Sequence, residues 1–137
     1  MNLITFILVS YALDSRAKQF NRCELAIELV KYGFPLNELQ DWVCLIEAES
    51  SRRTNAVHGP NEDGSYDYGL FQINSRYWCN TGATPGKVCK LRCEELLTDD
   101  ITKAVECTKT IYKLQGFEAW VTACRRSVFD SWAGRNA

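Results

Sequence analysis

The chain has 137 residues, of which 46% are apolar and 24% are charged, and its formal net charge at pH 7 is −1. This length suits one globular domain with a buried core. A chain with so little net charge and no polybasic run lacks the positive field of nucleic-acid-binding proteins, so we expect no nucleic-acid partner.

The first residues form a short apolar run, MNLITFILVSYAL, and Ser15 and Ala17 then stand at the −3 and −1 positions of a cleavage site. The run is too short to span a bilayer, so we expect no stable membrane insertion. It predicts a secretory signal peptide over 1–17, a mature domain over 18–137 and an extracellular location. The alternative is a short N-terminal helix, because no lysine or arginine precedes the run.

Seven cysteines in a short exported chain predict disulfide bonds, and the odd number leaves at least one thiol without a partner in the chain. Zinc is the alternative, with four candidate ligands: Cys79, Cys89, Cys93 and Cys107. Their spacing lacks the paired C-x₂-C pattern, and the leader directs the chain to an oxidising compartment. We therefore expect disulfides, no metal site and no cofactor.

Helices are predicted on both sides of a small β region. Residues 23–32 have apolar side chains at helical spacing and end at Gly33, and a second helix is expected over 37–51. Residues 54–80 are rich in Gly, Asn, Asp and Tyr, which predicts turns and strands. A third helix is expected to have Thr98 as its N-cap. This order of elements is typical of the α+β class.

Three shorter signals lie within this outline. An Asp-Gly pair at 63–64 predicts a hairpin turn, and SYDYGLFQIN at 65–74 predicts a strand. Asp99 and Asp100 would occupy the first turn of the third helix, where the helix dipole favours acidic side chains.

Two glutamates stand close together in LIEAES, residues 45–50. Two positions on a helix are separated by roughly 200°, so Glu47 and Glu49 face nearly opposite directions. One face of the predicted helix carries Trp42, Leu45, Ile46 and Glu49. Glu47 is therefore expected at the surface, whereas desolvation and the helix dipole should raise the pKa of Glu49 and suit it to general acid catalysis. The alternative is a Glu49 that turns out into water.

A second carboxylate, Asp67, lies in a polar strand near three side chains that can hydrogen-bond it and keep it ionised: Asn61, Ser65 and Asn74. One carboxyl in an apolar site and another in a polar site is the arrangement that glycosidases use. Aromatic rings follow at Tyr77, Trp78 and Trp120, and such rings stack on sugars. The alternative interpretation places each of these aromatics in the core.

Five segments carry a more specific pattern: KQFNRCELA at 18–26, WVCLIEAES at 42–50, DGSYDYGLFQINSRYWCN at 63–80, LLTDDIT at 96–102 and AWV at 119–121. Together they resemble the c-type (chicken-type) lysozymes, glycoside hydrolase family 22, and most of all the invertebrate secreted forms. The resemblance implies a helical lobe and a small antiparallel β lobe with a saccharide cleft between them. It also implies that the mature protein begins at Lys18.

The resemblance assigns the catalytic residues to Glu49, five positions after the cysteine of WVC, and to Asp67 of DYG. The implied reaction is hydrolysis of the β-1,4 bond between N-acetylmuramic acid and N-acetylglucosamine in bacterial peptidoglycan, with retention, for which lysozyme is the type case. Asn61 and Ser65 would orient Asp67. The sugar sites would be lined by Gln72, Asn74, Tyr77, Trp78, Trp120 and Val121.

The family has eight cysteines in four bridges, and three pairs carry over to this chain: Cys44–Cys124, Cys79–Cys93 and Cys89–Cys107. The fourth bridge would join Cys23 to a position that here holds Asn136. We therefore expect a free Cys23 or a bond to a second chain, and hence a monomer or a Cys23-linked dimer.

Further departures from the family affect the cleft and the calcium site that some relatives have. The interval from Trp120 to Cys124 is shorter than the family usually shows and lacks its second tryptophan, which alters one wall of the cleft. Some relatives bind calcium near LTDDIT, but the acidic ligands that they need are replaced by Lys103 and Ala104, so we expect no calcium dependence.

The balance of charge favours a mildly acidic working pH. Bacterial envelopes are anionic, and a protein with a pI of about 5.8 should be attracted to them better below that pH. We therefore hypothesise digestion of bacteria, with defence in a neutral body fluid as the alternative. There are two rival interpretations. One is a non-catalytic protein of the same fold that binds a saccharide or a protein, and the other is an inactive product. Such binding relatives generally lack one or both of the catalytic carboxylates.

Overall fold

The computed structural model describes residues 18–120 of the chain. The α-helices are α1 (Arg22–Lys31), α2 (Leu39–Ser50) and α3 (Thr102–Gln115). The strands are β1 (Val57–His58), β2 (Asp67–Tyr68) and β3 (Ile73–Asn74). Three short 3-10 helices complete this part, namely η1 (Leu36–Glu38), η2 (Cys93–Leu97) and η3 (Gly116–Ala119).

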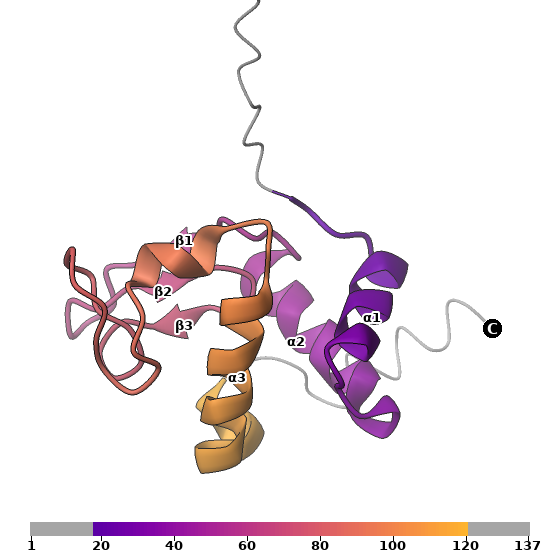
Figure 1. Ribbon diagram of the computed structural model, residues 1–137. Helices are drawn as coiled ribbons and strands as arrows, with labels where there is room; N and C mark the ends of the chain where they lie inside the picture. Colours follow the sequence, from indigo (N-terminus) through magenta and orange to yellow (C-terminus); the bar gives the residue numbers. More distant parts are fainter. Residues whose placement is uncertain (1–17, 121–137) are drawn as a thin grey trace, which may run out of the picture.

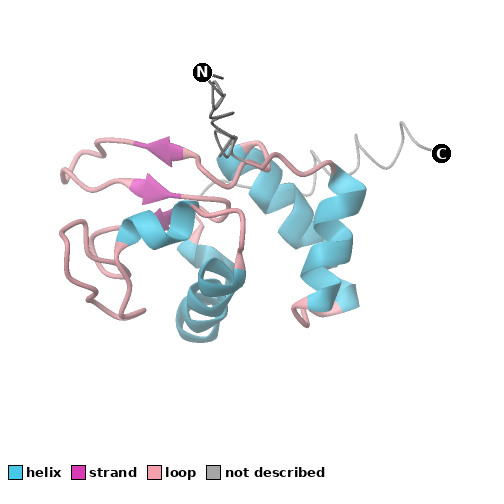
Figure 2. Ribbon diagram, turned by 45° about the horizontal axis from the view of Figure 1, so that its top comes forward, coloured by secondary structure: helices cyan, strands magenta, loops and turns pink. Residues whose placement is uncertain are grey.

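The elements form two lobes. In both ribbon views the strands lie on one side and α1 on the other, with α2 and α3 between them (Figure 1 and Figure 2). The predicted α+β class, with a helical lobe and a small antiparallel β lobe, is confirmed. No helix within residues 18–120 has the length and apolar character that crossing a bilayer requires.

The first helix begins at a reciprocal cap. The N–H of Glu24 donates to the side chain of Asn21 over 2.8 Å, and the Glu24 carboxylate accepts from the N–H of Asn21. The buried side chains of this helix, Leu25 and Leu29, face the core. Its bounds agree with the predicted helix at 23–32 to within one residue.

The second helix carries the centre of the core. Its buried apolar side chains are Trp42, Leu45 and Ile46, on the face that the sequence predicts. The Trp42 ring packs at 5.0 Å from the ring of Phe34 and 5.3 Å from that of Trp120. The predicted helix over 37–51 is divided, because η1 precedes α2.

The three strands form an antiparallel sheet in the order β1-β2-β3, and Asp67 in the middle strand pairs with His58 on one side and Asn74 on the other. The predicted strand over 65–74 is wrong in its middle, where a turn separates β2 from β3. Gly69 and Gln72 adopt positive φ angles of 77° and 50° there, which reverse the chain.

The third helix begins later than the sequence suggests. Thr98 follows η2 in an extended conformation and is not the N-cap of α3, which begins at Thr102. The predicted place of Asp99 and Asp100 in the first turn is wrong, because both precede the helix, whose N-cap is Ile101. The side chain of Asp100 accepts from the N–H of Thr102 over 2.9 Å and from its hydroxyl over 2.6 Å. Asp99 faces a different part of the chain.

Disulfides tie the β lobe to the helices. Cys79 bonds to Cys93 in η2, and Cys89 bonds to Cys107 in α3. Cys23 is exposed on α1 as a free cysteine of the described part. Several predictions concern residues outside 18–120. These are the leader, the subsite residue Val121, and Cys124, which is expected to pair with Cys44.

Candidate active site

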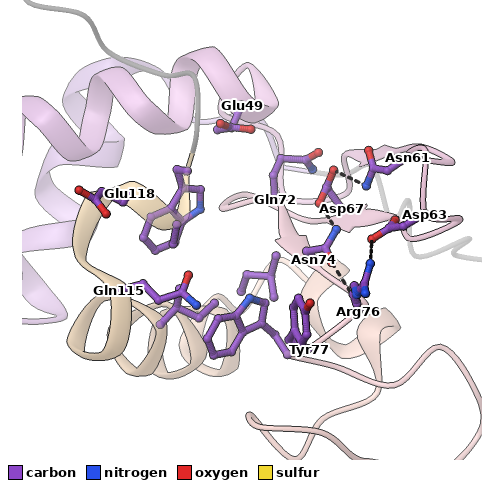
Figure 3. Close-up of a pocket in the computed structure, with 15 residues that line it drawn as sticks. Glu49, Asn61, Asp63, Asp67, Gln72, Asn74, Arg76, Tyr77, Gln115 and Glu118 are labelled. Carbon is purple, nitrogen blue, oxygen red and sulfur yellow. Dashed lines mark hydrogen bonds and ion pairs between the residues drawn. The ribbon is translucent and has the colours of Figure 1, made fainter.

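A cleft of about 680 Å³ separates the lobes. Its helical wall contains Glu49 near the end of α2, Gln115 at the end of α3, and Glu118 in η3. The opposite wall is built by the strands and the loop after β3. Figure 3 shows Glu49 and Asp67 on opposite walls, both directed into the cleft.

The two glutamates of α2 have different surroundings. Glu47 lies against α1, where Arg22 Nε donates to Glu47 Oε2 over 2.8 Å and Arg22 Nη2 donates to Glu47 Oε1 over 2.6 Å. The hydrogen bond from Arg22 holds the pKa of Glu47 below its usual value, despite partial burial. Glu49 is half-buried and lines the cleft. The helical spacing therefore separates a structural glutamate from one that can meet a ligand.

The carboxylate of Asp67 is held at both oxygens. Asn61 Nδ2 donates to Asp67 Oδ2 over 3.1 Å, and Asn74 Nδ2 donates to Asp67 Oδ1 over 2.9 Å. The same two amide groups also donate to Ser65 Oγ, over 3.0 and 2.9 Å. Each amide thus uses both hydrogens, which fixes its orientation. Asp67 is presented to the cleft as an oriented hydrogen-bond acceptor.

Ser65 contacts Asp67 only through other side chains. Its hydroxyl donates to Asp63 Oδ1 over 2.5 Å, so the serine that was expected to orient Asp67 instead bonds a neighbouring carboxylate. It influences Asp67 through Asn61 and Asn74, whose amide hydrogens it accepts.

A second acidic group and a cation complete this wall. Asp63 accepts the hydroxyl and the N–H of Ser65 and forms an ion pair with Arg76 at 3.0 Å. The Ser65 hydroxyl, its N–H and then Arg76 lower the pKa of Asp63 to about 2. Arg76 lies 5.3 Å from the centre of the Tyr77 ring. The sequence reasoning missed this pair, although an arginine beside an aromatic pair in SRYW was a usable signal.

Gln72 lines the cleft, but its amide group is occupied by the protein. Its Nε2 donates to the carbonyl oxygens of Ala56 and Gly69 over 3.0 and 2.9 Å, and His58 Nδ1 lies 2.6 Å from its Oε1. With both of its amide hydrogens donated, Gln72 Oε1 accepts from His58. The side chain therefore holds the turn between β2 and β3 in place.

The three candidate sugar-stacking rings differ in exposure. Tyr77 is 57% exposed, whereas Trp78 and Trp120 are 8% and 7% exposed. All three line the cleft, and Trp120 Nε1 donates to the carbonyl oxygen of Phe71 over 2.7 Å. Of these three rings, Tyr77 thus has the most open surface, while the two tryptophans are largely buried in the core. Gln115 and Glu118, which the sequence reasoning did not single out, also face this space (Figure 3).

Comparisons with known proteins agree on one family. The model of the C-type lysozyme/alpha-lactalbumin family matches residues 18–134. A lysozyme of Bombyx mori is 57% identical over 118 residues, covering 86% of this chain and 85% of that protein. Lysozyme P of Drosophila melanogaster is 43% identical, covering 88% and 86%. The crystal structure of canine milk lysozyme superposes with a TM-score of 0.69 at 38% identity, covering 76% of this chain and 84% of that one.

Proposed function

Because the chain belongs to the C-type lysozyme/alpha-lactalbumin family, we propose that it is a secreted lysozyme that cleaves β-1,4 bonds between N-acetylmuramic acid and N-acetylglucosamine in bacterial peptidoglycan. The observation that carries the proposal is the pair of carboxyl groups, Glu49 and Asp67, contributed by different lobes to opposite walls of one cleft. A binding protein without hydrolytic activity has no need of this pair.

In the proposed mechanism Glu49 is the general acid. It lies half-buried in the last turn of α2 on the wall of the cleft, from where it gives a proton to the leaving oxygen. Asp67, on the other side of the bond, attacks the anomeric carbon or stabilises its positive charge. Glu49 then removes a proton from water, and the configuration is retained.

The remaining groups of the cleft bind and orient the sugar chain. Tyr77 offers an exposed ring for stacking, and Arg76 is a hydrogen-bond donor beside it. Asn61 and Asn74 hold Asp67 in position for attack. The other proposed subsite residues are Ser65, Gln72, Trp78, Trp120 and Val121, of which Gln72 and Ser65 act by holding the wall rather than by direct contact.

Processing and covalent state belong to the same proposal. Residues 1–17 are removed as a signal peptide, which the start of the family match at residue 18 supports, and the enzyme acts outside the cell. Cys44 pairs with Cys124. Cys23 either remains a thiol, giving a monomer, or links two chains.

The decisive test is clearance of a suspension of bacterial cell walls by the parent protein and by Glu49→Gln. The amide cannot act as an acid, so we expect the rate to fall by at least about 100-fold. The matched control is Glu47→Gln, which makes the same chemical change two positions away on the same helix. It removes the ion pair with Arg22, at a cost of about 0–1 kcal/mol in the free energy of unfolding, and should leave the rate within about twofold.

Two results would contradict the proposal. One is a folded parent that clears no cell walls, and the other is a rate that depends on Glu47 rather than Glu49. Circular dichroism of each variant separates loss of chemistry from loss of folding.

A further inference from the structure

The stretch between Asp67 and Glu94 carries positive charges only. Residues 68–93 contain no acidic residue and four basic ones: Arg76, Lys87, Lys90 and Arg92. Both arginines form ion pairs, Arg76 with Asp63 and Arg92 with Glu94. Both lysines are exposed, and neither forms an ion pair with the acidic groups of residues 18–120. The uncompensated positive charge of this stretch therefore lies on the two lysines.

The two lysines stand at the ends of one turn. The N–H of Lys90 donates to the carbonyl oxygen of Lys87 over 3.1 Å, and Cys89 within the turn is bonded to Cys107 in α3. The lysines have positive φ angles of 60° and 54°, which are unfavourable for a residue with a side chain. Such conformations persist where the surrounding structure enforces them, and they cluster at ligand sites. Val88, between the lysines, is 48% exposed.

Hydrogen bonds hold this turn beside the wall of the cleft. The N–H of Val88 donates to the carbonyl oxygen of Tyr77 over 3.2 Å. Lys87 Nζ donates to the carbonyl oxygen of Ser75. Tyr77 and its neighbour Trp78 line the cleft, and the Tyr77 ring is the one proposed to stack on a sugar. The turn at 87–90 therefore borders the saccharide site.

The charge near the cleft indicates what the turn can bind. Among the described residues that line the cleft, the one basic side chain is Arg76, and Asp63 already accepts from it. Lys87 and Lys90 thus supply the positive charge at the margin that has no carboxylate beside it. The glycan strands of peptidoglycan carry stem peptides with free carboxylates, whereas chitin, a polymer of N-acetylglucosamine, carries none. Ammonium groups form charge-assisted hydrogen bonds with carboxylates, which are stronger than neutral ones.

We propose that Lys87, Val88 and Lys90 bind the stem peptides of a glycan strand that occupies the cleft, with the lysines donating to peptide carboxylates. Val88 adds an apolar contact between the two charges. The inference rests on the proposed function and deepens it, because it makes the peptide-bearing glycan a better ligand than an uncharged one. The contact acts at short range and leaves the formal charge of the whole molecule at −1.

The test measures binding in the Glu49→Gln variant, so that it does not depend on hydrolysis. The probe is a soluble glycan fragment of peptidoglycan with its stem peptides. The matched probe is the same fragment after its carboxylates have been converted to methyl amides, and we expect it to bind more weakly. Adding Lys90→Gln should raise the Kd of the charged probe by roughly two- to fivefold, and Lys87→Gln together with Lys90→Gln should raise it further. The Kd of the methyl-amide probe should stay within about 1.5-fold in both cases.

Lys31→Gln is the matched control, because it makes the same change of charge in α1, at the opposite end of the molecule from the loop after β3 (Figure 1). It should leave both Kd values unchanged. The proposal would be overturned by an equal loss for both probes, by no loss with Lys90→Gln, or by the same loss with Lys31→Gln. A folded protein that binds neither probe would contradict the proposed function as well. Binding of both probes that is insensitive to the lysines would contradict the role of the turn alone.

Discussion

The number of hydrogens that each polar side chain can donate determines the hydrogen-bond partners of Asp63 and Asp67 in the β lobe. The Ser65 hydroxyl has one hydrogen and gives it to Asp63, so it cannot donate to Asp67. Asp67 instead receives one amide hydrogen from Asn61 and one from Asn74. Two carboxylates of the β lobe therefore have separate tasks, since Asp63 holds Arg76 while Asp67 faces the cleft.

At this scale we predict a pH-dependent contribution of Asp63 to stability. Its folded pKa of about 2 lies below its ordinary value of 3.8, so the folded state favours the ionised form. The stabilisation is present above about pH 4 and is lost as the pH falls towards 2. Asp63→Asn should therefore lower Tm at pH 6, with the difference from the parent shrinking at low pH.

Thermal unfolding of both proteins at several pH values between 2 and 7 measures this difference. Glu62→Gln changes an exposed acid in the same loop and provides the control, whose curve should run parallel to that of the parent. A difference in Tm between Asp63→Asn and the parent that stays constant down to pH 2 would contradict a lowered pKa of Asp63 in the folded state.

The turn between β2 and β3 controls how closely the sheet approaches η2. Gly69 has a φ of 77°, and a Cβ at this position would overlap the carbonyl oxygen of Leu96 in η2. The turn can therefore form only if this position lacks a side chain. Because Asp67 and Asn74 stand on the two strands that the turn joins, its geometry also sets the distance between them.

We accordingly predict that Gly69→Ala costs more than about 2 kcal/mol in the free energy of unfolding, from backbone strain and overlap together. Gly64→Ala is the matched control, because Gly64 has a φ of 81° but open space around its Cβ position. It should cost only about 1 kcal/mol, from the strain of the left-handed conformation. Urea denaturation measures both, and equal costs would show that the contact with Leu96 is not limiting.

The charge of the whole molecule should shape its activity on cells. Residues 1–17 contain one acid, Asp14, and one base, Arg16, so their removal leaves the formal charge at −1. Long-range attraction to an anionic envelope is therefore weak at pH 7 and grows below the pI of about 5.8, where the protein becomes positive.

We predict that clearance of whole bacteria is faster near pH 5 than at pH 7. Added salt should slow it at pH 5, where it screens attraction, and should not slow it at pH 7. Initial rates at two ionic strengths and both pH values test this. An optimum above pH 7 at ordinary salt would favour the defence alternative over a digestive role.

The sequence alone determined the features that depend on local periodicity. Helical spacing placed Trp42 in the core and distinguished Glu49 from Glu47, since residues two apart on a helix face opposite ways. The order of elements was enough for the α+β class, and the start and end of α1 were predicted to within one residue.

Only the tertiary structure decided which distant groups meet. The ion pair of Asp63 with Arg76 and the break in the predicted strand at Gly69 both depend on segments from elsewhere in the chain. The same holds for the contact between Lys18 and Asp99. Local patterns report helix or strand propensity and which face is buried, whereas these contacts join residues that lie apart in the sequence, and no short window of sequence contains both partners.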